Sequence, residues 1–253
     1  FWLRCAYDGG RNSRCGMAGY AIAAAARRFL QTMERVLHRQ LPSYTPKEER
    51  INTVTHIIGA AFGVVFFILA IALGIAHRNI WSVASGAVYG ICVVGLFCVS
   101  SIYHGLQPSL RKAVMRVVDH CTIYLMICGT YTPILLVRIR SEQPVIAWVV
   151  FGVQWALAAI AVFLNTMDLK KFRVLSMALY IAMGWCIIFV LQPTIAAIGW
   201  PAFWWLLAGG VCYTVGAVLY GIGKKKRYFH AAFHLFVNLG SLLQAVCILG
   251  YVL

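Results

Sequence analysis

The chain has 253 residues, of which 62% are hydrophobic and only 11% are charged. Soluble domains carry about 25% charged residues, so this composition excludes an ordinary soluble protein and indicates a membrane protein with several spans. A formal net charge of +15 also occurs in nucleic-acid-binding proteins, but in so apolar a chain basic loops facing an anionic leaflet account for it, and we expect no nucleic-acid partner.

The first 47 residues differ from the rest and are predicted to form a separate basic segment. Residues 1–17 show no apolar periodicity and are expected to be disordered or not native, with Met17 as a candidate start. Residues 20–40 place apolar side chains against arginines at helical spacing, which predicts an amphipathic helix lying on the inner leaflet. The alternative is a solvated helix that leads into the bundle.

Seven apolar runs follow, each long enough to cross about 30 Å of hydrocarbon. They are residues 52–76, 80–104, 113–137, 144–165, 172–192, 201–222 and 228–251. Helix is the only economical conformation for such runs, because each helix satisfies its own backbone hydrogen bonds. The sequence therefore predicts an all-α membrane fold, a seven-transmembrane helical bundle over residues 48–253.

The basic residues predict the orientation of this bundle. Of the 22 Lys and Arg residues, only Arg78, Arg138 and Arg140 fall in the loops on the side opposite the N-terminus. Because loops rich in Lys and Arg stay in the cytoplasm, we expect a cytoplasmic N-terminus and a C-terminus outside, in the inner (plasma) membrane of the cell. The expected partners are membrane lipids, including the anionic inner leaflet next to the basic loops.

His230 and His234 open the last apolar run as His-Ala-Ala-Phe-His. Four residues are about one helical turn, so both imidazoles leave the same helix face and can bind one transition metal ion. An ionisable side chain inside a membrane segment is costly, and a pair of them there indicates a functional site.

The other ionisable residues of the spans fall at the same depth, in the cytoplasmic half of the predicted bundle. These residues are His56, His104, Asp119, His120, His230 and His234. A catalytic zinc site takes three protein ligands, and His104, which closes the second span, is the best candidate for the third. Asp119 is then the natural base or partner of a zinc-bound water. Ser100, one turn before His104, can bind that water or a substrate carbonyl.

Each assignment has a structural alternative. Asp119 can be a counter-ion for Arg116, and Ser100 can bond back to a helix carbonyl. His104 can be an interfacial histidine without a metal. His56 and His120 are expected to be structural, with hydrogen bonds inside the bundle.

Five motifs follow one another along the chain: Asn-Thr-Val-Thr-His-Ile-Ile-Gly (52–59), Ser-Ser-Ile-Tyr-His (100–104), Val-Asp-His (118–120), Gly-Thr-Tyr-Thr-Pro (129–133) and His-Ala-Ala-Phe-His (230–234). Together they resemble the bacterial hemolysin III family, which belongs with the progestin and adipoQ receptors and is related to the alkaline ceramidases. The resemblance covers residues 48–253. It implies seven spans, a cytoplasmic N-terminus and an intramembrane Zn²⁺ held by His104, His230 and His234. Asp119 matches the family's aspartate that holds the metal-bound water, and Ser100 matches its serine.

The leading functional hypothesis is a zinc-dependent hydrolase of lipid amides, similar to ceramidases. Zinc-bound water attacks the amide carbonyl, Asp119 acts as the base, and the bundle admits an acyl chain from the bilayer. One alternative is a pore-forming, hemolysin-like channel, which needs polar residues along its whole length. Another is a zinc-stapled membrane sensor without turnover.

Overall fold

The computed structural model describes residues 41–223 and 226–253, together with residues 24, 27 and 31. Within these residues every regular element is a helix, which confirms the predicted all-α class. The unpatterned segment 1–17 lies outside the described residues, and so does nearly all of the amphipathic helix expected over residues 20–40.

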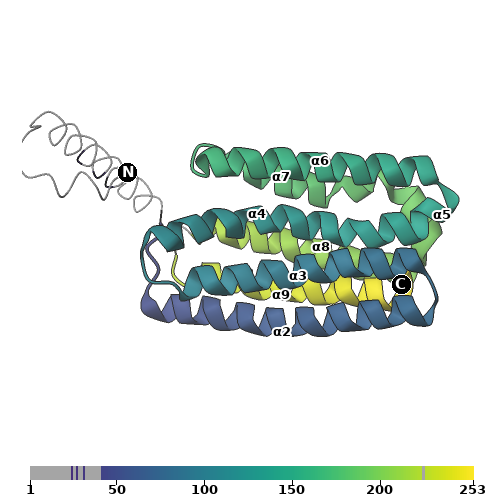
Figure 1. Ribbon diagram of the computed structural model, residues 1–253, viewed down its shortest axis with the longest axis horizontal. Coiled ribbons are helices and arrows are strands. Elements are labelled where there is room, and N and C mark those ends of the chain that lie inside the picture. Colours follow the sequence, from purple (N-terminus) through teal and green to yellow (C-terminus); the bar gives the residue numbers. More distant parts are fainter. Residues whose placement is uncertain (1–23, 25–26, 28–30, 32–40, 224–225) are drawn as a thin grey trace, which may run out of the picture.

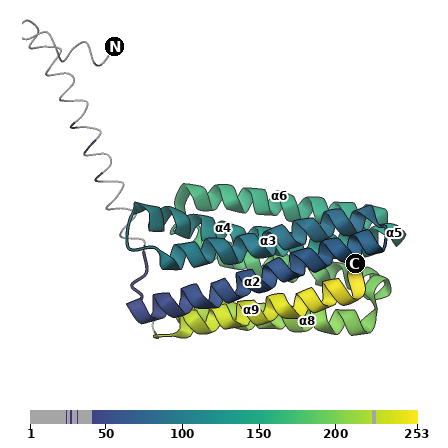
Figure 2. The same ribbon diagram turned by 60° about the horizontal axis from the view of Figure 1, so that its bottom comes forward.

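The long helices run side by side along one axis (Figures 1 and 2). In chain order the elements are α2 (Pro46–Ala76), α3 (Ile80–Gly105), α4 (Leu110–Pro133), the π-helix η1 (Ile134–Ile139), α5 (Arg140–Glu142), α6 (Pro144–Asp168), α7 (Arg173–Gly184), the 3₁₀-helix η2 (Cys186–Val190), α8 (Leu191–Ile222), α9 (Phe229–Cys247) and the π-helix η3 (Ile248–Val252). Six helical segments of the described chain are long and apolar enough to cross a membrane.

One of these six segments contains two of the seven predicted spans. Arg173–Ile222 is 50 residues long and includes the predicted runs 172–192 and 201–222. Its helical geometry is interrupted at Gly199, where φ is 77° and ψ is 163°. An L-residue with a side chain rarely adopts this conformation, and Pro201 lies two residues later. The break falls between the two predicted runs.

The outer surface of the bundle is apolar, as a lipid-facing surface must be. Large side chains remain well exposed on it, among them Ile68 at 59%, Phe163 at 62% and Val174 at 76%. The seven cysteines within the described residues are free. The observed chain is thus a bundle built for a lipid environment, without cross-links among the cysteines that can be described.

The first turn of α2 is anchored by a capping box that also reaches α9. The Thr45 hydroxyl accepts a hydrogen bond from the Glu48 amide at 3.3 Å, and the Glu48 carboxylate accepts one from the Thr45 amide at 2.9 Å. The same carboxylate accepts a hydrogen bond from the Tyr228 amide at 2.9 Å, just before α9 begins. These bonds hold the first turns of α2 and α9 next to each other.

Candidate metal centre

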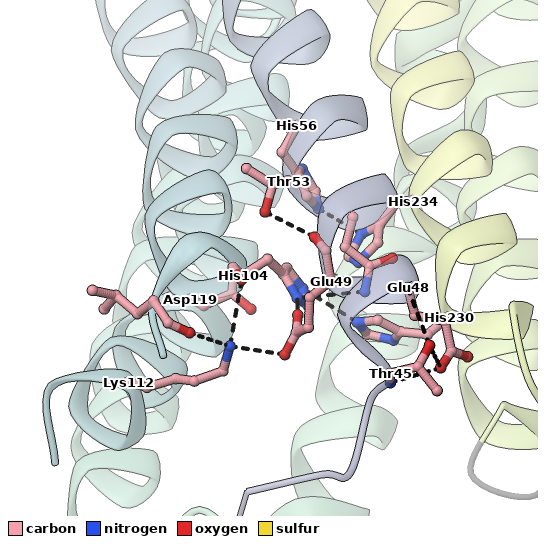
Figure 3. A network of polar contacts seen from close by, with 12 residues as sticks. Thr45, Glu48, Glu49, Thr53, His56, His104, Lys112, Asp119, His230 and His234 are labelled. Atoms are coloured by element: carbon pink, nitrogen blue, oxygen red, sulfur yellow. Dashed lines mark hydrogen bonds and ion pairs between the residues drawn. The ribbon is translucent and has the colours of Figure 1, made fainter. Parts of the chain in front are cut away.

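Four histidine rings from three helices meet at one end of the bundle (Figure 3). His56 comes from the third turn of α2, His104 from the last turn of α3, and His230 and His234 from the first turns of α9. Because α2 and α9 begin at this end of the molecule and α3 finishes there, the topology brings together side chains up to 178 residues apart in sequence.

The three predicted ligands lie side by side. Nε2 of His104 and Nε2 of His230 are 3.4 Å apart. The ring centroids are separated by 4.3 Å for His230 and His234, 5.0 Å for His104 and His234, and 5.2 Å for His104 and His230. His104 and His234 are each only 2% exposed. This arrangement places the three imidazoles next to one another, with His230 more exposed than the other two.

His56 belongs to the same cluster, although the sequence favoured a purely structural role for it. Its Nε2 lies 2.5 Å from Nδ1 of His234. His56, His104 and His234 also form a group in which one ligand atom from each residue lies within 4.8 Å of the others. The sequence feature that could have placed His56 in the cluster is its depth in the membrane, because His56 opens the first span at the level of the other histidines.

Glu49 and Lys112 are neighbours of the cluster that the sequence analysis did not single out. Oε2 of Glu49 lies 2.6 Å from Nδ1 of His104, and Oε1 lies 2.8 Å from the Lys112 ammonium (Figure 3). Lys112 is buried and also donates a hydrogen bond to the Leu106 carbonyl at 2.8 Å. In sequence, Glu49 appeared to be an ordinary acidic residue of a first helical turn, and Lys112 an ordinary loop lysine.

Asp119 and Ser100 approach the cluster from α4 and α3. Ser100 is buried and lies next to the Asp119 carboxylate, whose side chain is 14% exposed. Arg116 and His104 are both near enough to Asp119 to interact electrostatically with it. His120, next in sequence, bonds through Nδ1 to the Arg116 carbonyl at 2.9 Å and through Nε2 to the Tyr220 hydroxyl at 3.4 Å.

Two cavities meet at this site. A polar vestibule of about 580 Å³ opens at the loop end, and its basic lining residues are Arg116, Lys170, Arg173, Lys226 and Arg227. A second cavity of about 190 Å³ has an apolar lining that includes Leu96, Ile134 and Phe203. Asp119, His120, Tyr220 and His230 line both cavities. The site therefore stands between a charged entrance and an apolar interior.

Tyr44 covers the vestibule side of the cluster. Its ring stacks on His230 with a centroid separation of 4.7 Å and an interplanar angle of 17°. Burial raises the pKa of the Tyr44 hydroxyl above its ordinary value, so this ring stays neutral at physiological pH. A neutral aromatic ring here limits the access of water to His230 without adding charge.

The donor set fits a transition metal ion. Nε2 of His234 is buried without a hydrogen-bond partner among the described residues. A buried ring nitrogen in this condition is costly unless it has a ligand. Neutral imidazole nitrogens are the ligands that zinc and related ions prefer, and a catalytic zinc site uses three of them.

Comparisons with known proteins agree with this picture. A family model described as "Haemolysin-III related" matches residues 44–245. Hemolysin-3 of Bacillus cereus is 34% identical over 207 residues, which cover 82% of this chain and 93% of that protein. The Hemolysin-3 homolog of Bacillus subtilis is 31% identical over 208 residues, covering 82% and 96%. The human monocyte to macrophage differentiation factor is 27% identical over 239 residues, covering 88% and 94%. No solved structure gives a significant match.

Proposed function

The chain belongs to the haemolysin-III related family, and on that premise we propose that it is a zinc-dependent hydrolase of lipid amides with its active site inside the membrane. The observation that carries the proposal is the junction of a three-histidine cluster with Asp119, Ser100 and an apolar cavity. His104, His230 and His234 hold the ion. A zinc ion in such a site supplies Lewis acidity and lowers the pKa of water bound to it to about 7.

The remaining chemistry belongs to side chains of the chain itself. Asp119 accepts the proton of the water that attacks the amide carbonyl, and it returns a proton to the departing amine. Ser100, which lies next to Asp119, holds that carboxylate in place and orients the substrate carbonyl. The position of Asp119 between the vestibule and the apolar cavity lets it contact both water and a buried chain.

The shape and lining of the inner cavity support a lipid substrate. Its walls include Leu96, Ile123, Met126 and Ile134, which suit an acyl chain. A hydrated ion needs polar groups along its path, so this lining favours a hydrolase over the pore that the name of the Bacillus cereus relative suggests for that protein. The remaining alternative is a structural zinc that only links α3 to α9. A measurement of turnover distinguishes a structural zinc from a catalytic one.

We further propose that residues 48–253 cross the inner membrane seven times, with the basic vestibule on the cytoplasmic side against an anionic leaflet. A helix of 50 residues spans about 75 Å, more than twice the hydrocarbon thickness, so Arg173–Ile222 is too long for one crossing. Lys170 and Lys226, which flank this segment, both line the vestibule. A reversal at Gly199 turns the segment into two antiparallel spans.

Metal content and turnover test the two parts of this proposal separately. Purified protein is expected to contain close to one zinc per chain by elemental analysis, and His234→Ala is expected to lose it. Stoichiometric zinc in that variant contradicts the centre. Zinc-loaded wild type should release fatty acid from at least one member of a broad panel of lipid amides. A loaded protein that is inactive on the whole panel contradicts hydrolysis but not metal binding, and identifies the ion as structural.

A further inference from the structure

α2 brings polar side chains to the cluster from a single face. Glu49, Asn52 and His56 are three and four residues apart, so they project from the same side of the helix. Each lies against a histidine of another helix: Glu49 and Asn52 contact His104, and His56 contacts His234. The metal ligands proposed above come from α3 and α9, which leaves the role of this α2 face unassigned.

Glu49 determines which nitrogen of His104 carries the hydrogen. An ionised carboxylate can only accept, so the 2.6 Å contact of Glu49 Oε2 with Nδ1 of His104 requires a hydrogen on Nδ1. The lone pair of the neutral ring is then on Nε2. That atom is the one 3.4 Å from Nε2 of His230, inside the cluster. Lys112, at 2.8 Å from the other oxygen of Glu49, keeps the carboxylate ionised and oriented.

His56 stands in the same relation to His234. Its Nε2 lies 2.5 Å from Nδ1 of His234, and the outer nitrogens of the two rings, Nδ1 of His56 and Nε2 of His234, are both buried without a hydrogen-bond partner among the described residues. If His234 donates from Nδ1, its lone pair is on Nε2 and is free for a metal. His56 then acts as the acceptor, as Glu49 does for His104.

The short contact also argues against His56 as a ligand through the atom nearest to His234. Two nitrogens bound to one tetrahedral zinc at about 2.0–2.1 Å are about 3.3 Å apart. The separation of 2.5 Å between His56 Nε2 and His234 Nδ1 is too short for that, whereas one hydrogen shared in a short hydrogen bond accounts for it. The separation of 3.4 Å between His104 Nε2 and His230 Nε2 matches the expected value.

We propose that α2 supplies the outer shell of the metal centre and none of its ligands. Glu49 and His56 are positioning residues: each accepts a hydrogen bond from Nδ1 of a ligand histidine and so presents Nε2 of that ring to the ion. This inference rests on the metal proposed at His104, His230 and His234. Outer-shell partners of this kind typically contribute 10–100-fold to metal affinity.

The test is the zinc dissociation constant of the full-length protein in detergent, measured by competition with a chromophoric chelator. His56→Leu removes the acceptor and is expected to raise Kd about 10–100-fold while one zinc still binds at saturation. His56→Gln keeps an acceptor oxygen and should recover much of the affinity. Glu49→Gln is expected to raise Kd about tenfold through loss of the charge. His230→Ala, which removes a ligand, should lose stoichiometric zinc.

His77→Leu is the matched control. His77 lies at the far end of α2, where its Nδ1 contacts the Leu253 carbonyl at 2.8 Å. The zinc Kd of the His77→Leu variant should therefore equal that of the wild type. Cobalt loading of His56→Gln adds a second readout that does not depend on affinity, because four-coordinate Co²⁺ keeps its intense visible bands only if the ligand set is intact.

Two results overturn the assignment. Loss of stoichiometric metal in His56→Gln, with retention in His230→Ala, makes His56 a ligand in a set with His104 and His234. A wild-type Kd in both His56→Leu and Glu49→Gln shows that neither residue positions a ligand. Absence of metal from the wild type is a different failure, because it contradicts the proposed centre itself and the outer shell with it.

Discussion

Asp119 is more accessible than three of the four clustered histidines. Its side chain is 14% exposed and lines both cavities, as His230 also does, whereas His56, His104 and His234 are each 2% exposed. A group that exchanges protons needs access to water, and a metal ligand does not. At the scale of the residue, we therefore expect metal binding and proton transfer to depend on different side chains.

Asp119→Asn separates these two roles. The amide keeps the shape of the carboxylate but cannot accept the proton, so turnover should fall about 10²–10⁴-fold while zinc remains near one per chain. Fatty-acid release and elemental analysis of the same preparation measure the two quantities.

Asp168→Asn is the matched control for that substitution. Asp168 accepts hydrogen bonds from the amides of Lys170 and Lys171 in the loop after α6 and lies outside both cavities. The turnover of the Asp168→Asn variant should equal that of the wild type. If Asp119→Asn loses zinc along with activity, Asp119 is a ligand, and if it keeps full turnover, another group is the base.

At the scale of the element, α8 and α9 approach closely enough that glycine is required at the crossing. A Cβ added at Gly209 would lie 2.5 Å from Cγ of Gln244 and 3.0 Å from the Gly240 carbonyl oxygen. A Cβ at Gly240 would lie 3.1 Å from the Gly209 carbonyl oxygen. Small residues that let backbones meet are the usual means of packing helices in a membrane, where the hydrophobic effect between helices is weak.

Gly209→Ala is expected to lower the free energy of unfolding by about 1–3 kcal/mol, because the added methyl group overlaps Gln244 and the backbone of α9. Thermal unfolding of the protein in detergent measures the effect. Gly210→Ala is the control, since a Cβ there meets nothing within 4 Å and alanine favours the helix. Equal stability of the two variants would contradict the tight crossing.

Within the described residues, a polar vestibule lies at one end of an apolar bundle. The vestibule collects basic residues from the N-terminal end of α4, from the loop after α6 and from the loop before α9. Two long helices lie between each of these segments and the next. The segments can meet at one end only if the two helices of each pair run in opposite directions. The proposed topology of seven spans makes this end cytoplasmic.

Single cysteines introduced at Lys170 and Lys226, in a chain without its native cysteines, test this topology. Both should resist a membrane-impermeant thiol reagent in intact cells and react in inverted vesicles. Arg78→Cys, in the loop between α2 and α3, should behave in the opposite way. Reaction of the Lys170 and Lys226 positions from opposite sides would mean that Arg173–Ile222 crosses only once and would reduce the count to six.

Much of this architecture can be predicted because its causes are local. The length and apolarity of a segment decide whether it enters a membrane, and these two properties were enough to predict the helical bundle. Helical periodicity puts His230 and His234 on one face, since the spacing of one turn depends on no other part of the chain. The break at Gly199 also falls between two runs that were predicted separately.

The roles of Glu49, Lys112 and His56 could not be predicted in this way. Each depends on contacts between α2, α3 and α4 or α9 at sequence separations of up to 178 residues. A glutamate in a first turn and a lysine near a loop are typical of any helix, and only the ion pair between them and the contact of Glu49 with His104 distinguish these two residues.

The sequence by itself determined that this protein is a helical membrane protein of the haemolysin-III related family with histidines gathered at one depth. Only the tertiary structure decided which side chains face the cluster, and therefore which ring nitrogens can be free for a metal. The physical reason is that a neutral imidazole has one donor and one acceptor nitrogen, and the partner that contacts one of them determines the role of the other. Those partners lie on another helix, where no local pattern can place them.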